Sequence, residues 1–293
     1  MAILEIQDVT KTYGDFTAVE DVSMTIEPGE VYGFIGPNGA GKSTTIRMII
    51  GAIGITKGSI FVDGVDVSEN KKYLEKISYV PGDVSLWPNL TGLEVINFLM
   101  AARGYTNTER RDELISKFRL DPKKKCKTYS KGNRQKVALI SALCSDAELY
   151  IFDEPTSGLD PLMEHTFHEE VRQLNRDGRS VLLSSHILSE VEKLADRISI
   201  IKDGKVVESG KFSEMRHITR MKYILTSPEN LSGLGDLSYV HDMEIHRDAV
   251  HVMVDNDNIP EFLTELKHHN ITHLETEPTK LEDVFLRFYE AGR

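Results

Sequence analysis

The sequence predicts an α/β fold, in which a mostly parallel central sheet carries an antiparallel β flank, an inserted helical subdomain and a small C-terminal α+β domain. Three observations predict this fold. Short apolar strands alternate with helical patterns over the first two thirds of the 293 residues. One long stretch without strand-like runs interrupts this alternation, and the pattern changes after about residue 215.

Residues 1–215 are predicted to form the first domain. Short strand-like runs, apolar or alternating, are separated there by segments with helical periodicity. We expect strands at residues 4–10, 18–26, 31–36, 59–64, 77–80, 149–154, 181–186, 197–204 and 205–210. We expect helices at residues 42–50, 91–102, 108–118, 132–145, 161–177 and 188–195. Hairpin-like strands at both ends predict the antiparallel flank. Residues 84–146 hold no convincing strand and predict the helical subdomain.

The second domain, residues 221–293, has its own strand and helix patterns. Strands are expected within 222–227 and 249–255, followed by a helix over 259–269 and a final amphipathic helix over 280–290. This is typical of a small accessory domain. A role in stabilising a dimer and a passive appendage both remain open for it.

Composition limits the partners and the compartment. Lys and Arg number 35 against 46 Asp and Glu, a formal charge of −11, so no nucleic-acid partner is expected, because sequence-independent binding needs a basic face. Cys126 and Cys144 are too few for a disulfide framework and indicate thiols in a reducing cytosol. The most apolar run, near residues 46–55, is short of the roughly 20 residues that span a bilayer. We therefore expect a protein that is soluble by itself and reaches a membrane only through a partner.

The segment "GPNGAGKST" at residues 36–44 has the pattern of a phosphate-binding loop between a strand and a helix. Its glycines let successive backbone N–H groups turn toward an anion, and the helix N-terminus adds partial positive charge. Lys42 supplies a full charge for the β- and γ-phosphates, and the Ser43 hydroxyl can ligate Mg²⁺. The predicted phosphate-binding residues are Gly36, Pro37, Asn38, Gly39, Ala40, Gly41, Lys42, Ser43 and Thr44.

Two further strands end in residues that suit phosphate chemistry. "LYIFDE" ends in Asp153 and Glu154, at the strand edge where ligands of open α/β sheets bind. Asp153 is the candidate Mg²⁺ ligand, and Glu154 is the candidate to polarise an attacking water. "VLLSSH" ends in His186, which can reach a γ-phosphate from the neighbouring strand.

Together these motifs resemble the ATP-binding cassette family over roughly residues 3–215. The resemblance implies ATP and Mg²⁺ as ligands, with Glu154 and His186 catalytic. It also implies two cassettes that face head to tail, so that each ATP lies between the phosphate loop of one copy and the signature segment of the other. A GTPase is excluded, because Asn70–Lys71 is followed by Lys72 and Tyr73 instead of a base-reading Asp.

The signature segment is "YSKGN", residues 129–133, where the family has Leu-Ser-Gly-Gly-Gln. Ser130 and Gly132 match, and the resemblance implies that they contact the ATP of the partner copy. A plain helix N-cap is the alternative for Ser130. By the same resemblance Tyr13 stacks on adenine, and Asp160 crosses the dimer interface.

One position departs from the family in a way that bears on coupling. Gly82 stands where the family usually has Gln or Glu, so no side chain there can reach Mg²⁺ or water. Asp83, one position later, is the candidate substitute. ATP binding is not affected by this departure.

A single cassette without an apolar span is typical of a transporter motor subunit that pairs with a second copy, or a related subunit. The resemblance is strongest to exporter subunits, and it implies separate transmembrane permease subunits and a peripheral place on the cytoplasmic face of the membrane. Trp87 and Leu90 are candidate contacts for the permease, and packing inside the helical subdomain is the equal alternative for both. A soluble ATPase acting on a macromolecular complex and a nucleotide-dependent regulator are the other two functions considered.

Overall fold

The computed structural model describes residues 1–211, 220–246 and 249–277. The chain divides into two compact units, Met1–Ser209 and Gly210–Arg293. Each has a core of its own, and each is described separately below.

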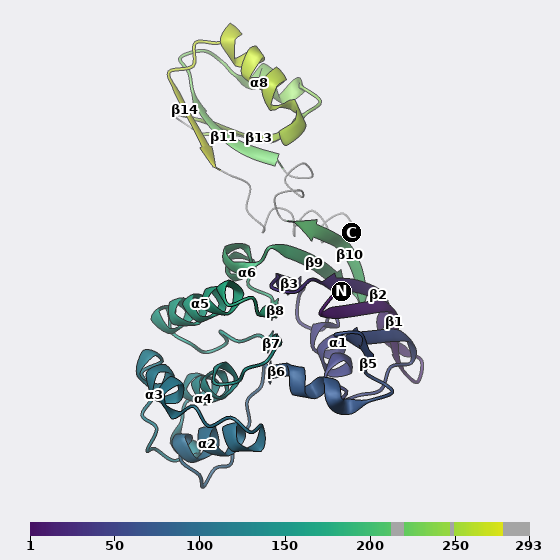
Figure 1. Ribbon diagram of the computed structural model, residues 1–293. Coiled ribbons are helices and arrows are strands. Elements are labelled where there is room, and N and C mark those ends of the chain that lie inside the picture. Colours follow the sequence, from purple (N-terminus) through teal and green to yellow (C-terminus); the bar gives the residue numbers. More distant parts are fainter. Residues whose placement is uncertain (212–219, 247–248, 278–293) are drawn as a thin grey trace. The chain divides into compact units, whose positions relative to one another are not determined.

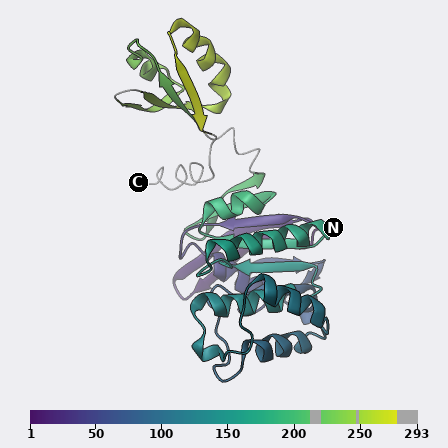
Figure 2. The ribbon, with the colours of Figure 1, turned by 90° about the vertical axis from the view of Figure 1, so that its left-hand side faces the viewer.

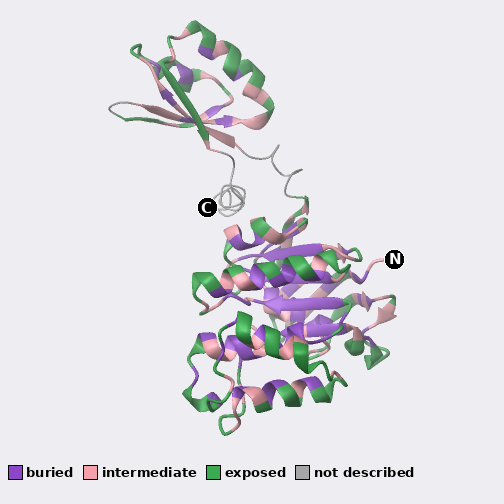
Figure 3. Ribbon diagram, turned by 60° about the vertical axis from the view of Figure 1, so that its left-hand side comes forward, coloured by how far each residue is buried: buried purple, intermediate pink, exposed green. Residues whose placement is uncertain are grey.

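The first unit is built on a six-stranded sheet with the order β10-β9-β3-β8-β7-β6. Its strands are β3 (Val31–Ile35), β6 (Ile77–Val80), β7 (Leu149–Asp153), β8 (Ser180–Ser185), β9 (Arg197–Lys202) and β10 (Lys205–Lys211). β3 pairs in parallel with β8 and β9, and β7 pairs in parallel with β6 and β8. Every residue of β3, β7 and β8 is buried, because both faces of a parallel sheet are covered. Figure 3 shows these strands at the centre of the unit.

A second, antiparallel sheet with the order β2-β1-β4-β5 forms the flank. Its strands are β1 (Leu4–Tyr13), β2 (Phe16–Ile26), β4 (Lys57–Val62) and β5 (Val65–Asp66). Apolar side chains of this sheet and of the parallel sheet share one buried cluster that includes Leu4, Ile60 and Phe34. The predicted combination of a parallel sheet with an antiparallel flank is therefore confirmed.

The helices of the first unit lie where the periodicity predicts them. They are α1 (Lys42–Ile49), α2 (Gly92–Ala102), α3 (Thr108–Lys117), α4 (Lys131–Leu143), α5 (Pro161–Arg176) and α6 (Leu188–Leu194), with 3₁₀ turns η1 (Lys71–Lys76) and η2 (Cys126–Thr128). Side-chain caps begin α2, α3, α4 and α5. Thr91 and Glu94 form a capping box at the start of α2. Figures 1 and 2 show α2, α3 and α4 grouped together beyond the β6 edge of the sheet.

The second unit is a four-stranded antiparallel sheet with the order β12-β13-β11-β14. Its elements are β11 (Arg220–Thr226), η4 (Ser232–Asp236), β12 (Val240–Ile245), β13 (Val250–Asp255), η5 (Asn256–Asn258), α8 (Ile259–Glu265), η6 (Leu266–His268) and β14 (His273–Glu277). Phe262 of α8 packs edge-on against Tyr223 of β11 in the core. The strands within 222–227 and 249–255 are confirmed, whereas the predicted helix over 280–290 lies outside the described residues.

Candidate functional site

The predicted phosphate loop connects the buried end of β3 to the start of α1. Gly39 and Gly41 have φ values of +84° and +111°, a region that glycine enters without steric cost. A Cβ on Gly36 would overlap the backbone carbonyl of Ile201 on β9, so this position also requires glycine. The glycines of the motif are therefore explained by the local turn and by the neighbouring strand.

The remaining loop residues lie in one tight turn. The Ala40 N–H donates to Pro37 O at 3.2 Å, and the Ala40 carbonyl accepts from the Gly204 N–H at 3.0 Å, which ties the loop to the β9–β10 turn. Asn38 is exposed at the tip. Ser43 and Thr44 are half-buried in the first turn of α1.

Lys42 is the charged centre of this loop. Its side chain is only 5% exposed, and Nζ donates to Gly36 O at 2.6 Å and to Pro37 O at 3.2 Å. The same Nζ lies 3.3 Å from Oε1 of Glu154. A buried ammonium needs such partners, because removing it from water is costly.

Asp153 and Glu154 lie at the carboxyl end of β7, next to the end of β8. Asp153 is 4% exposed, and its carboxylate accepts a hydrogen bond from the Ser184 hydroxyl. The Glu154 N–H donates to Ser184 O at 3.0 Å. Glu154 has a φ of +50°, uncommon for a residue with a side chain. That turn of the backbone directs its carboxylate toward Lys42.

His186 completes this group from the residue after β8. Its Nδ1 contacts Oε2 of Glu154 directly, while its side chain remains 45% exposed. Lys42, Glu154 and His186 follow three different strands of the sheet, β3, β7 and β8. The structure thus brings together three residues that the sequence proposes separately.

Gly82 lies against the backbone of Asp153 and the Cβ of Glu154. A Cβ at this position would be 3.2 Å from Asp153 O and 3.4 Å from the Glu154 Cβ. Asp83 is exposed. The departure from the family pattern therefore occurs beside Asp153 and Glu154. A Cβ fits at this position only if these neighbours shift by a few tenths of an ångström.

The signature segment opens α4. The Asn133 N–H donates to Ser130 Oγ at 3.3 Å, so Ser130 is the N-cap of this helix. A Cβ on Gly132 would overlap Gly158 O, and Lys131 Nζ donates to Ser157 Oγ at 2.6 Å. Both contacts hold the helix start against the "SGLD" turn, residues 157–160 of the same chain.

Two further predicted residues lie on the surface. Asp160 is the N-cap of α5, and its Oδ1 accepts from the Leu162 and Met163 N–H groups at 3.1 Å. Tyr13 is 50% exposed at the end of β1, with Lys11 Nζ 4.9 Å from its ring centroid. Lys11 lies over the ring, and the exposed half of Tyr13 is accessible to a flat ligand.

The sequence predicts no role for Ser184, and none for Ser157 beyond its place in the 157–160 motif. Ser184 orients Asp153, and Ser157 anchors Lys131. A signal for Ser184 was present, since two polar residues interrupt the apolar strand "VLLSSH" just before His186.

The donor set at the end of β7 fits Mg²⁺. Asp153 offers a carboxylate and Ser43 a hydroxyl, and hard oxygen ligands are those that Mg²⁺ prefers. Among the described residues, Glu154 Oε1 is buried without a hydrogen-bond donor and lies 3.3 Å from the Lys42 ammonium. This oxygen therefore retains capacity to accept a further ligand.

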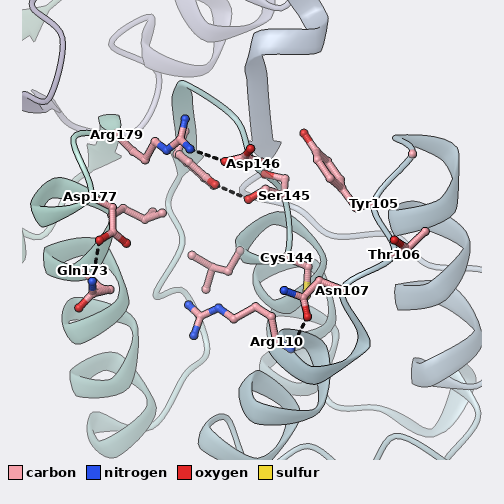
Figure 4. Close-up of a pocket in the computed structure, with 14 residues that line it drawn as sticks. Tyr105, Thr106, Asn107, Arg110, Cys144, Ser145, Asp146, Gln173, Asp177 and Arg179 are labelled. Atoms are coloured by element: carbon pink, nitrogen blue, oxygen red, sulfur yellow. Dashed lines mark hydrogen bonds and ion pairs between the residues drawn. The ribbon is translucent and has the colours of Figure 1, made fainter.

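A separate cavity of about 660 Å³ lies at the opposite, amino-terminal edge of the strands (Figure 4). Its charged groups are already engaged, since Arg179 pairs with Asp146 and the Arg110 guanidinium pairs with Glu170. The Tyr150 hydroxyl donates to Ser145 O at 2.6 Å. This cavity is distinct from the phosphate loop.

Comparison with known proteins identifies the family. A family model described as ABC transporter matches residues 19–157. The chain is 34% identical, over 97% of both chains, to the uncharacterized ABC transporter ATP-binding protein YhaQ of Bacillus subtilis (strain 168). The chain belongs to the ATP-binding subunits of ABC transporters. Its predicted family and fold are therefore confirmed.

Other relatives of this ABC ATPase have names that refer to antibiotics. The linearmycin resistance ATP-binding protein LnrL of Bacillus subtilis (strain 168) is 33% identical over 97% of both chains. The bacitracin transport ATP-binding protein BcrA of Bacillus licheniformis is 34% identical over 85% of this chain and 83% of the relative.

Two solved structures resemble the ABC ATPase. An ATP-binding subunit of an ABC transporter is 34% identical, with a TM-score of 0.69 over 73% of this chain and 92% of that chain. A dimeric ATP-binding cassette, in a post-hydrolysis state bound to ADP and Pi, is 28% identical, with a TM-score of 0.64 over 71% of this chain and 98% of that chain. Among the described residues of the ABC ATPase, no helix has the length and apolar character needed to cross a bilayer.

Proposed function

We propose that this ABC ATPase is the motor of an exporter and that it hydrolyses ATP between two copies of the chain. The contact of Lys42 Nζ with Glu154 Oε1 at 3.3 Å, with His186 on the same carboxylate, is the observation that supports the proposal most strongly. In this proposal Lys42 is the phosphate-binding charge, Glu154 is the general base, and His186 contacts the γ-phosphate.

The residues of one chain bind and orient the nucleotide. The backbone N–H groups of residues 36–44 and the Lys42 ammonium hold the phosphates, while Tyr13 stacks on the adenine. Asp153 and Ser43 would hold Mg²⁺, and the ion would supply positive charge against the β- and γ-phosphates. When ATP enters, its phosphates replace Gly36 O, Pro37 O and Glu154 as partners of Lys42.

Glu154 then acts on water. Released from Lys42, its carboxylate accepts a hydrogen bond from the attacking water and orients it toward the γ-phosphorus. His186 holds one Glu154 oxygen from the side and donates to the γ-phosphate once that phosphate is bound. The left-handed backbone at Glu154 keeps the carboxylate at the end of the sheet throughout.

The second copy supplies the opposite wall of the site. Ser130 and Gly132 at the start of α4 present backbone N–H groups and a helix N-terminus to the γ-phosphate bound by the partner. Asp160 ends the 157–160 turn that lies against the start of α4, and it would face the same interface. The contacts of Gly132 with Gly158 and of Lys131 with Ser157 make this wall rigid.

Export through separate permease subunits is supported by the relatives and by one surface feature. Relatives are named for bacitracin transport and for linearmycin resistance. Trp87 and Phe98 are 49% and 54% exposed, and their rings pack edge to face at 5.2 Å. Together with half-buried Leu90 they form an apolar surface on the helical subdomain that suits a permease helix, at the cytoplasmic face of the membrane.

The decisive experiment is Glu154→Gln with ATP. The amide keeps the shape of the carboxylate but is a poor base, so ATP stays intact and the two copies stay closed around it. Size-exclusion chromatography with light scattering should show a stable dimer with ATP and a monomer without it. The added substitution Lys42→Ala should abolish that dimer. A Glu154→Gln chain that remains monomeric at saturating ATP would contradict the proposal.

A further inference from the structure

Three side chains of the second unit, Glu244, His246 and His251, converge beside the turn between β12 and β13. Each offers one ligand atom, and these atoms all lie within 4.8 Å of one another. His246 Nε2 is 3.3 Å from Glu244 Oε2, and the rings of His246 and His251 are 4.4 Å apart between centroids. None of these residues belongs to the phosphate loop or to the signature segment.

The strand pairing explains why they meet. Glu244 lies directly opposite His251 in the antiparallel ladder. His246 follows Glu244 by two residues, and side chains two apart lie on the same side of a strand. The His246 N–H donates to Ala249 O at 2.8 Å, which continues the pairing beyond the ends of β12 and β13.

A β-bulge brings this face of β12 into register. The ladder shifts between His241 and Glu244, and Asp242 within the shift has a φ of +48°. The opposite face of β13 is occupied by Val252 and Val254, which are fully buried in the core of the unit. The three side chains therefore lie on the outer face, where Glu244 and His246 are exposed and His251 is half-buried.

We propose that Glu244, His246 and His251 form a binding site for a divalent transition-metal ion of the Zn²⁺ class. Tetrahedral Zn²⁺ with bonds of about 2.0–2.1 Å needs ligand atoms roughly 3.3 Å apart. The His246 and Glu244 atoms already have this spacing, and the His251 ligand atom, within 4.8 Å of both, would move closer to become the third ligand. Water fills the fourth position.

The ligand types separate this site from the nucleotide site. Imidazole nitrogens favour Zn²⁺ and related ions, whereas Mg²⁺ prefers oxygen ligands and retains its waters. The ion would also join β12 to β13 only in the folded chain. Binding to the folded state alone raises the free energy of unfolding by mass action.

The test uses the full chain without a histidine tag, after removal of metal with a chelator. Zn²⁺ is titrated by calorimetry in the presence of excess Mg²⁺, and we expect one saturable site per chain. His246→Ala and His251→Ala should each weaken Zn²⁺ binding by on the order of tenfold or more, as the loss of one ligand predicts. His273→Ala is the matched control, because His273 is an exposed histidine of the same sheet, 3.9 Å from Glu275, and lies outside the cluster.

Thermal unfolding gives a second readout that also detects misfolded variants. Zn²⁺ should raise the Tm of the wild-type chain and of His273→Ala but leave the Tm of His251→Ala unchanged. Glu244→Gln, an exposed substitution of equal size, should weaken binding without lowering the metal-free Tm. Zn²⁺ binding that is absent from the wild-type chain, or that survives both histidine substitutions, would overturn the site.

Discussion

Lys42 Nζ lies 3.3 Å from Oε1 of Glu154, so an ion pair joins the phosphate loop to the acidic end of β7. Both side chains are largely buried, and each satisfies part of the charge of the other. In the proposed mechanism the triphosphate replaces Glu154 as the partner of Lys42. The step that binds the phosphates would then also free the carboxylate that is proposed to act on water.

Lys42→Ala should weaken ATP binding by on the order of tenfold or more, since a full charge is lost from the phosphate cradle. Titration of a fluorescent ATP analogue measures this effect. Lys57→Ala is the control, because Lys57 is exposed and pairs only loosely with Asp21 at 3.7 Å. Equal ATP affinities of the Lys42→Ala and wild-type chains would show that residues 36–44 are not the phosphate-binding loop.

Gly132→Ala should lower both stability and turnover. The added Cβ overlaps Gly158 O, so the start of α4 must move away from the "SGLD" turn, at a cost of about 1–3 kcal/mol. Thermal unfolding and phosphate release measure the two effects. Gly54→Ala is the matched control, since a Cβ there meets no atom within 4 Å. Wild-type turnover in Gly132→Ala would show that the position of α4 does not matter.

Ser130→Ala separates capping from catalysis. Loss of the N-cap should cost about 1 kcal/mol of stability. ATP binding by the single chain should stay close to wild type, and turnover should fall, because the hydroxyl would serve the nucleotide of the partner copy. Ser116→Ala, in the exposed last turn of α3, provides the control for the loss of a helical serine. A matching loss of ATP affinity in Ser130→Ala would contradict the two-chain site.

Gly82→Gln should reduce turnover while ATP binding is retained. The Cβ would lie 3.2 Å from Asp153 O, so the acidic pair must shift by a few tenths of an ångström from its position beside Lys42. Steady-state hydrolysis and equilibrium ATP binding distinguish the two properties. Gly82→Ala shows how much of the effect the Cβ alone produces. A rise in turnover would instead show that the glycine limits this enzyme.

Stability should fall between about pH 6.5 and pH 4 because of His168. This side chain of α5 is 8% exposed, and burial lowers its pKa to about 4 from the ordinary value near 6.5. The neutral ring is favoured in the folded chain, so its contribution is complete above pH 6.5 and is lost as the pH falls toward 4. This difference in the pKa of His168 between the unfolded and folded chain corresponds to about 3 kcal/mol of unfolding free energy.

Comparison of His168→Leu with the wild-type chain isolates that effect from other titrating groups. Denaturant unfolding at pH 7 and at pH 4 should show a smaller loss of stability in the variant. His165→Leu, exposed on the same helix beside Glu169, should lose as much stability as the wild-type chain. Equal losses in all three chains would mean that the folded-state pKa of His168 is not lowered.

Much of the first unit can be predicted from local patterns. Continuous apolar runs identify β3, β7 and β8 because both of their faces are covered, and the phosphate loop is recognisable because glycines are needed at Gly39 and Gly41. In the second unit β12 and β14 escape prediction. The bulge at Asp242 breaks the alternation of β12, and β14 exposes most of both its faces.

The sequence by itself determined the fold class, the phosphate loop and the identity of the acidic and histidine candidates, because these depend on residues that are near one another in the chain. Only the tertiary structure decided that Lys42 contacts Glu154 and that Glu244 lies opposite His251. It also decided that Gly158 leaves no space for a Cβ at Gly132. Those relationships depend on strand order and on register. Strand order and register are set by packing between segments that are distant in the chain. The local sequence pattern of a single segment therefore does not reveal them.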